Sequence, residues 1–127
     1  MDITQPSRQT RSREIPLDSA DFQTLFMLGD SMEPTICAND KVVYFVVNKL
    51  ADDGIYVIRL DGHLKVKYIQ RFAGGALHLI STNERYSPEV LTPVGGKDLP
   101  QLYHSKQSGL VGRLEVVGKV LFSRGPH

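Results

Sequence analysis

The sequence is almost free of cysteine, because Cys37 stands alone among 127 residues. A single cysteine excludes an internal disulfide and indicates a reducing compartment. No apolar run approaches the roughly 18 residues that span a bilayer, and the first residues lack the charged-then-apolar pattern of a secretory signal. We therefore expect a soluble, cytoplasmic protein that makes no membrane contact.

An excess of charge of either sign is also missing. Fifteen Lys and Arg residues stand against 14 Asp and Glu residues, which gives a net charge of +1. A domain that binds nucleic acid through its own surface normally carries a clear basic excess, so the composition argues against that role. The four histidines lack the spacing of metal ligands, and we expect neither a metal nor a cofactor.

The chain has no long helical period, and its apolar residues gather instead in short β-type segments. No window of about 12 residues keeps a helical period without a breaker, so we predict a mostly β fold. The expected strands are 24–28, 41–47, 55–60, 63–72 and 76–81, with a last strand pair in 112–124. Asp61-Gly62 predicts a type I′ hairpin turn, because that turn needs positive φ. Gly118 predicts a bend or a bulge.

Two stretches have no strand pattern. Residues 1–20 are polar and contain two prolines, which predicts a disordered linker or arm. Residues 21–127 then form one domain, a size that suits a single core. Residues 83–109 are rich in Pro, Gly and Ser, and we expect a long irregular excursion there.

The stretch GDSMEPTI, residues 29–36, is poor helix and poor strand. Gly29 and Pro34 punctuate its backbone, which predicts a tight turn that presents the hydroxyl of Ser31. A serine needs a base to become a nucleophile. The four histidines leave a Ser-His-Asp arrangement open, because the members of such a triad can be far apart in sequence and close in the fold. Lysine is the other candidate base, since the strand HLKVKYIQ places Lys65, Lys67 and Ile69 on one face. The alternation alone favours two solvated lysines.

GDSMEPTI followed by Val66-Lys67, in which Lys67 comes 36 positions after Ser31, resembles the LexA-type serine-lysine peptidases. These include the SOS repressor, phage repressors and the mutagenesis protein UmuD, with signal peptidase I more distant. Asn39-Asp40 before a strand and STNERYSP after the lysine also match. The resemblance implies a complex β-fold of short, strongly bent strands. It makes Ser31 the nucleophile and Lys67 the general base, with Asp30 and Met32 shaping the turn and its oxyanion site.

The chemistry implied for Lys67 requires an unusual environment. At a reference pKa of about 10.4, only roughly one lysine in 2,500 is neutral at pH 7. Burial against apolar neighbours lowers a lysine pKa, because it disfavours the ammonium form. The resemblance therefore implies that Lys67 is desolvated and that Lys65 points elsewhere.

The resemblance also implies partners, and the sequence departs from the family pattern at some positions. It implies a homodimer that pairs through C-terminal strands, DNA contact only through an N-terminal helix-turn-helix outside this sequence, and a RecA-type recombinase filament as co-protease in an SOS response. No Ala-Gly or Cys-Gly bond precedes Ser31, and Tyr68 stands where many relatives have arginine. Two functions stay open: a (self-)cleaving repressor domain, and a non-cleaving dimerisation and regulatory module. A membrane signal peptidase is a poor third, because no anchor helix is present.

Overall fold

The computed structural model describes residues 21–125, and nearly all of its regular structure is β-strand. No helix among these residues is long and apolar enough to cross a membrane. The mostly β class expected from the sequence is confirmed. The strands are β1 (Phe22–Phe26), β2 (Lys41–Val46), β3 (Gly54–Leu60), β4 (His63–Arg71), β5 (Leu77–Ile80), β6 (Glu89–Pro93), β7 (Leu102–Ser105) and β8 (Val111–Arg124).

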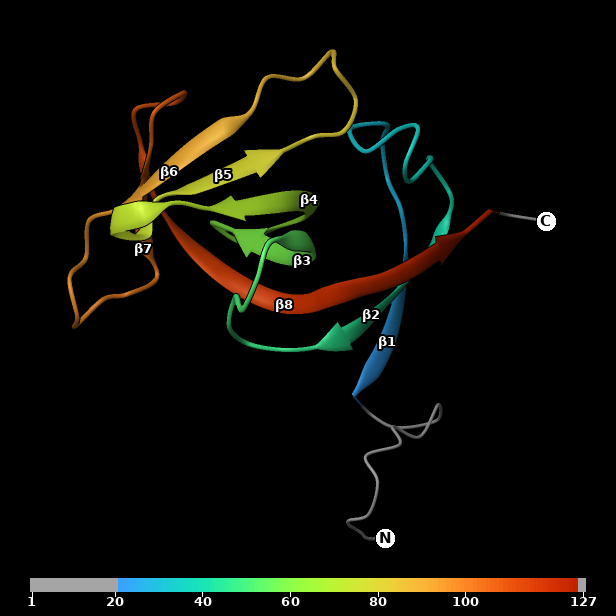
Figure 1. Ribbon diagram of the computed structural model, residues 1–127, viewed down its shortest axis with the longest axis horizontal. Coiled ribbons are helices and arrows are strands. Elements are labelled where there is room, and N and C mark those ends of the chain that lie inside the picture. Colours follow the sequence, from blue (N-terminus) through green and yellow to red (C-terminus); the bar gives the residue numbers. More distant parts are fainter. Residues whose placement is uncertain (1–20, 126–127) are drawn as a thin grey trace, which may run out of the picture.

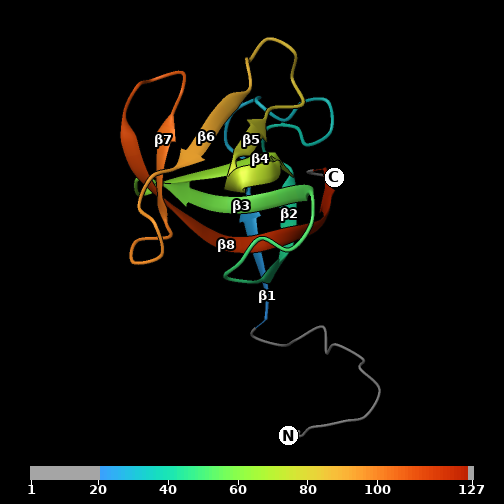
Figure 2. The same cartoon turned by 60° about the vertical axis from the view of Figure 1, so that its left-hand side comes forward.

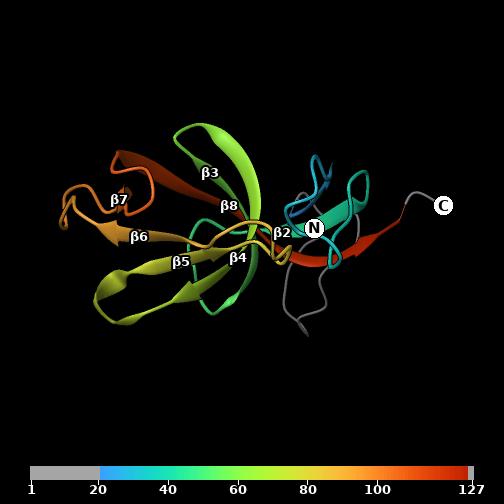
Figure 3. The same cartoon turned by 90° about the horizontal axis from the view of Figure 1, so that it is seen from above.

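The 14-residue strand β8 organises the sheet. Its residue Lys119 pairs with Phe45 of β2 and with Tyr56 of β3, so these two strands lie at opposite edges of β8. Arg113, earlier in β8, pairs with Leu102 of β7. Because β3 to β7 follow one another in the sheet, this last pairing closes β3–β8 into a barrel. Figures 1 and 3 show β8 crossing from the β6–β7 end of the molecule to the β1–β2 end.

Two apolar clusters lie on the two faces of β3. Tyr56 and Ile58 belong to the cluster inside the barrel, which also contains Ile69 of β4 and Leu79 of β5. Val57 points the other way, into a second cluster that is shared with β2 and with the segment after β1. All three β3 residues are buried, and burial of such a side chain stabilises the fold by about 1.5–3 kcal/mol. The two clusters therefore fasten the β1–β2 pair to the barrel through a common strand.

Two local predictions are confirmed. Asp61 and Gly62 both have positive φ, 55° and 87°, in the hairpin between β3 and β4. The register between β3 and β8 shifts between Val57 and Ile58, opposite Gly118. A Cβ at Gly118 would lie 2.2 Å from the Tyr44 ring, so the backbone of β8 needs a glycine to pass this close to β2.

Three segment predictions need correction. Residues 83–109 contain strands β6 and β7, which are too short, at five and four residues, to show a pattern of their own. The expected last strand pair is one continuous strand, β8, bent by its bulges. The first strand covers Phe22–Phe26 rather than 24–28. The predicted arm, residues 1–20, lies outside the described residues.

Candidate active site

Ser31 lies in the turn that connects β1 to β2. Gly29 takes a positive φ of 79° before the turn, and the N–H of Ile36 donates to the carbonyl of Met32 at 2.7 Å. Met32 and Ile36 are fully buried in the cluster between this turn and β2–β4. The turn is therefore anchored from below by its apolar residues, and Ser31 itself is only partly exposed.

A second loop, residues 81–88, braces the serine turn. The Thr82 hydroxyl donates to the carbonyl of Met32 at 2.6 Å, and the backbone N–H of Asn83 donates to the carbonyl of Ser31 at 3.1 Å. The Asn83 side-chain amide donates to the carbonyl of Asp30 at 2.9 Å. Figures 1 and 2 both place this loop beside the segment between β1 and β2. Three consecutive backbone carbonyls around Ser31 are thus fixed from outside the turn.

The Asp30 carboxylate accepts a hydrogen bond from the Tyr86 hydroxyl at 2.5 Å. This bond, followed by the negative charge of Asp30, raises the pKa of Tyr86 above its ordinary value. The resemblance gave Asp30 a part in shaping its own turn. Asp30 is partly exposed, and its side chain ties the turn to the bracing loop.

Lys67 projects from β4 on the face that points into the barrel. Its cross-strand partner is Tyr56, which belongs to the barrel cluster. The ammonium donates to the hydroxyl of Ser81 at 2.7 Å, and Ser81 is only 9% exposed. Burial, and after it the positive charge of Lys65, lowers the pKa of Lys67, whereas the negative charge of Glu89 raises it. The sequence pattern favoured solvated lysines, but Lys67 is half-buried, as the neighbouring Ile69 suggested.

Ser31 and Lys67 line one cavity of about 380 Å³, which we call the serine cavity. Its rim contains exposed apolar side chains, with Leu28 at 86%, Phe26 at 67% and Leu64 at 53% exposure. Lys65 also lines this cavity, so it lies near the site rather than away from it. A serine-lysine dyad requires the Ser31 hydroxyl to lie within hydrogen-bonding reach of the Lys67 amine. The hydrogen bond that this amine makes goes to Ser81, so direct contact between Ser31 and Lys67 is a prediction.

Residues 3–99 match the protein family described as Peptidase S24-like. The chain belongs to the S24 peptidase family. The chain is also similar to a curated protein, the HTH-type transcriptional regulator PrtR of Pseudomonas aeruginosa, with 32% identity over 102 residues. The match covers 79% of this chain and 37% of PrtR, so the chain spans little more than a third of that relative's length.

The resemblance named Ser31 and Lys67 as the reacting groups and matched STNERYSP, residues 81–88, without giving its residues a role. Ser81, the last residue of the expected strand 76–81, and Thr82 after it were not named as site residues. β5 pairs antiparallel with β4, Tyr68 opposite Ile80, and one further step along both strands brings Lys67 opposite Ser81. This register is seen in the structure and cannot be read from the sequence pattern. Among residues 21–125, no three His, Cys, Asp or Glu side chains come together in a way that would hold a metal ion.

Proposed function

We propose that this chain is the C-terminal regulatory domain of a LexA- or phage-type transcriptional repressor, with Ser31 as nucleophile and Lys67 as general base for peptide cleavage. The observation that carries the proposal is that Ser31 shares a cavity with a half-buried lysine of lowered pKa. S24 membership and the relative's description as a transcriptional regulator add support. The chain would act in the cytoplasm and contact DNA only through a helix-turn-helix outside this sequence.

In the proposed reaction, the neutral Lys67 amine takes the Ser31 proton while the serine oxygen attacks a peptide carbonyl. Backbone N–H groups of the turn, those of Asp30 and Ser31, would donate to the resulting oxyanion. Collapse of the tetrahedral intermediate breaks the C–N bond, and the Lys67 ammonium returns the proton to the leaving amine. A water molecule, deprotonated by the same amine, then hydrolyses the acyl-enzyme.

The surroundings of Lys67 suit this role because they favour the neutral amine without isolating it. Burial lowers the pKa of Lys67, and a base works best when its pKa lies near the working pH. The Ser81 hydroxyl holds the amine in place. Because Ser81 is uncharged, it orients the amine without the strong stabilisation of the ammonium that a carboxylate would give.

Cleavage in trans tests the proposal. A peptide with an Ala-Gly step between β-branched residues should be cut slowly, and faster as the pH rises from 7 to about 10, because more Lys67 becomes neutral. Ser31→Ala and Lys67→Ala should abolish the cut, whereas the exposed controls Ser87→Ala and Lys106→Ala should retain it. The chain itself should stay intact at pH 7 by mass spectrometry, since no Ala-Gly or Cys-Gly bond precedes Ser31.

The second candidate is a non-cleaving dimerisation and regulatory module. It is favoured by the absence of an Ala-Gly or Cys-Gly bond among the given residues before Ser31. Lack of peptide cleavage even at pH 10, with the fold intact, would select this candidate. A role for a RecA-type filament as co-protease belongs only to the cleaving candidate.

Dimerisation is part of both candidates. Leu121 and Phe122, near the end of β8, are 49% and 53% exposed, and two-fold pairing would cover them. We expect a dimer by sedimentation at tens of micromolar. Phe122→Asp should give a monomer with an unchanged circular dichroism spectrum, whereas a monomeric wild-type chain would contradict this part of the proposal.

A further inference from the structure

A second and larger cavity lies at the other end of the barrel from Lys67. It encloses about 630 Å³ beside the turn between β4 and β5, a size within the range of small-molecule sites. Arg71, which lines it, follows Lys67 by four residues on the same face of β4, and so lies about 13 Å away along the strand. The buried residues Ile69 and Leu79 of the barrel core separate the two positions. We call this space the Arg71 cavity.

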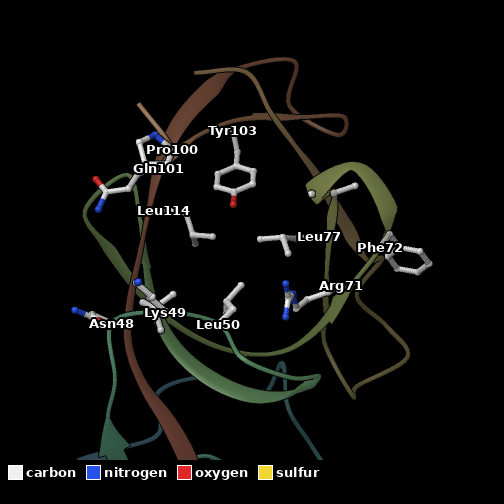
Figure 4. A pocket seen from close by; sticks show the side chains of 13 residues that line it. Asn48, Lys49, Leu50, Arg71, Phe72, Leu77, Pro100, Gln101, Tyr103 and Leu114 are labelled. Carbon is white, nitrogen blue, oxygen red and sulfur yellow. The ribbon is translucent and has the colours of Figure 1, made fainter. Parts of the chain in front are cut away.

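The floor of the Arg71 cavity is apolar. Leu77 and Leu114 are buried members of the barrel cluster, and Leu50 and Val116 pack against them. Figure 4 shows the side chains of Leu50, Leu77 and Leu114 directed toward the centre of the space. Such a floor accepts a hydrocarbon body and gains free energy as water leaves it.

The polar groups of this cavity favour a negative charge. Arg71 and Lys49 line it, and none of its described lining residues is Asp or Glu. The guanidinium donates to the Ala51 carbonyl at 2.6 Å, which steadies the group and uses one of its five N–H donors. A planar guanidinium held in this way is suited to a carboxylate, which it can bind through two parallel hydrogen bonds.

Tyr103 supplies a third polar group on the opposite side. Figure 4 shows its hydroxyl directed into the cavity, between Leu77 and Leu114 and across from Arg71. Burial raises the pKa of Tyr103, and the positive charge of Arg71 opposes that rise. The charge of Arg71 is therefore felt at the hydroxyl, and both groups can address one bound anion.

From these observations we propose that the Arg71 cavity binds a small carboxylic acid with an apolar body, its carboxylate on Arg71 and Tyr103 and its hydrocarbon part on the leucine floor. The site is separate from the serine cavity, and the proposal does not depend on peptide cleavage. It gives the domain a ligand site in addition to its candidate active site.

Octanoate is a suitable probe, with octan-1-ol as its neutral analogue and octylammonium as its cationic one. In ¹⁵N-labelled protein, octanoate should shift the backbone amide signals of Arg71, Leu77, Tyr103 and Leu114 saturably, with a Kd below about 1 mM. Octanol and octylammonium should bind at least about tenfold more weakly, because they lack the charge that Arg71 and Lys49 recognise.

Substitutions locate the site. Arg71→Gln should weaken octanoate binding about tenfold, and Lys49→Gln and Tyr103→Phe should weaken it several-fold. Arg59→Gln removes an exposed arginine from the middle of the sheet and should leave binding unchanged. The proposal fails if octanoate shifts only signals around Ser31 and Lys67, if octanol binds as tightly, if no saturation occurs by 10 mM (about ten times the expected Kd), or if Arg71→Gln and Lys49→Gln both bind normally.

Discussion

Lys67 and Arg71 lie four residues apart on one face of β4, yet their surroundings are opposite. Lys67 is half-buried and donates to the hydroxyl of a buried serine, and burial lowers its pKa. Arg71 is exposed and donates to a backbone carbonyl. Burial makes a lysine easier to deprotonate, whereas a guanidinium keeps its charge. The same strand thus carries a lysine of lowered pKa at one end of the barrel and a permanent cation at the other.

Replacing Lys67 by arginine should have the largest effect on the rate of peptide cleavage, and replacing Arg71 by lysine should have little effect. Lys67→Arg keeps the positive charge but removes a group that can be deprotonated, so cleavage of the Ala-Gly peptide in trans should fall by at least about 10²-fold, the usual contribution of a positioned base. The matched change Arg71→Lys should leave the rate within about twofold. Initial rates at pH 9 measure both. An active Lys67→Arg enzyme would remove the lysine from the base role.

Loss of the partner of Lys67 should have a smaller effect. Ser81→Ala leaves the amine in the cavity without its acceptor, and we expect a 10- to 100-fold lower cleavage rate from misplacement of the base, an estimate of about the cost of a 1 Å error. The pH–rate profile should also move to lower pH, because the ammonium loses a hydrogen bond that stabilises its charge.

Ser81→Thr is the matched rescue, since it restores the hydroxyl, and Ser123→Ala is the control for serine loss elsewhere. If Ser81→Ala lowered the rate without any movement of the profile, Ser81 would have only a structural role.

Removal of each of two charges near Lys67 should shift the pH–rate profile of cleavage, in opposite directions. The charge of Lys65 lowers the pKa of Lys67 and that of Glu89 raises it. Lys65→Gln should therefore move the rise in cleavage rate to higher pH, and Glu89→Gln should move it to lower pH. Glu89 also accepts from Ser105, so stability must be measured in parallel. Shifts of the same sign in both variants would contradict the electrostatic account.

The sequence reveals those parts of this structure that depend on local dihedral angles or on a motif. Asp61-Gly62 predicted its turn, because both residues take positive φ there. Gly118 predicted a bend or a bulge, and the structure adds the reason, since β2 leaves no space for a Cβ at this position. Strands β6 and β7 were missed because five and four residues are too few to show an alternation of their own. They are strands because they pair with β5, with each other and with β8.

The candidate site also has residues that the sequence predicted and residues that it did not. Ser31 and Lys67 were found from a motif and its spacing, and the structure lines one cavity with both. Ser81 was missed because its contact with Lys67 depends on the register of β4 against β5, which the intervening turn sets. A slip of one residue would turn Ser81 to the other face of the sheet. Neither composition nor alternation carries that information.

The smallest effect should appear in folding stability. Because burial lowers the pKa of Lys67 in the folded state, the unfolded chain binds this proton more readily. The associated cost is fully present below the folded-state pKa and disappears as the pH rises toward the unfolded value near 10.4. Lys67→Met removes the cost, so its melting temperature relative to wild type should be higher at pH 7 than at pH 10. Loss of the bond to Ser81 also lowers the stability of this variant, so the change between the two pH values, and not the offset at either one, tests the desolvation. The exposed control Lys106→Met should show no such pH dependence.

Thermal scans of the three proteins at both pH values measure the difference. If the melting temperature of Lys67→Met differed from that of wild type by the same amount at pH 7 and pH 10, this lysine would not be desolvated in solution.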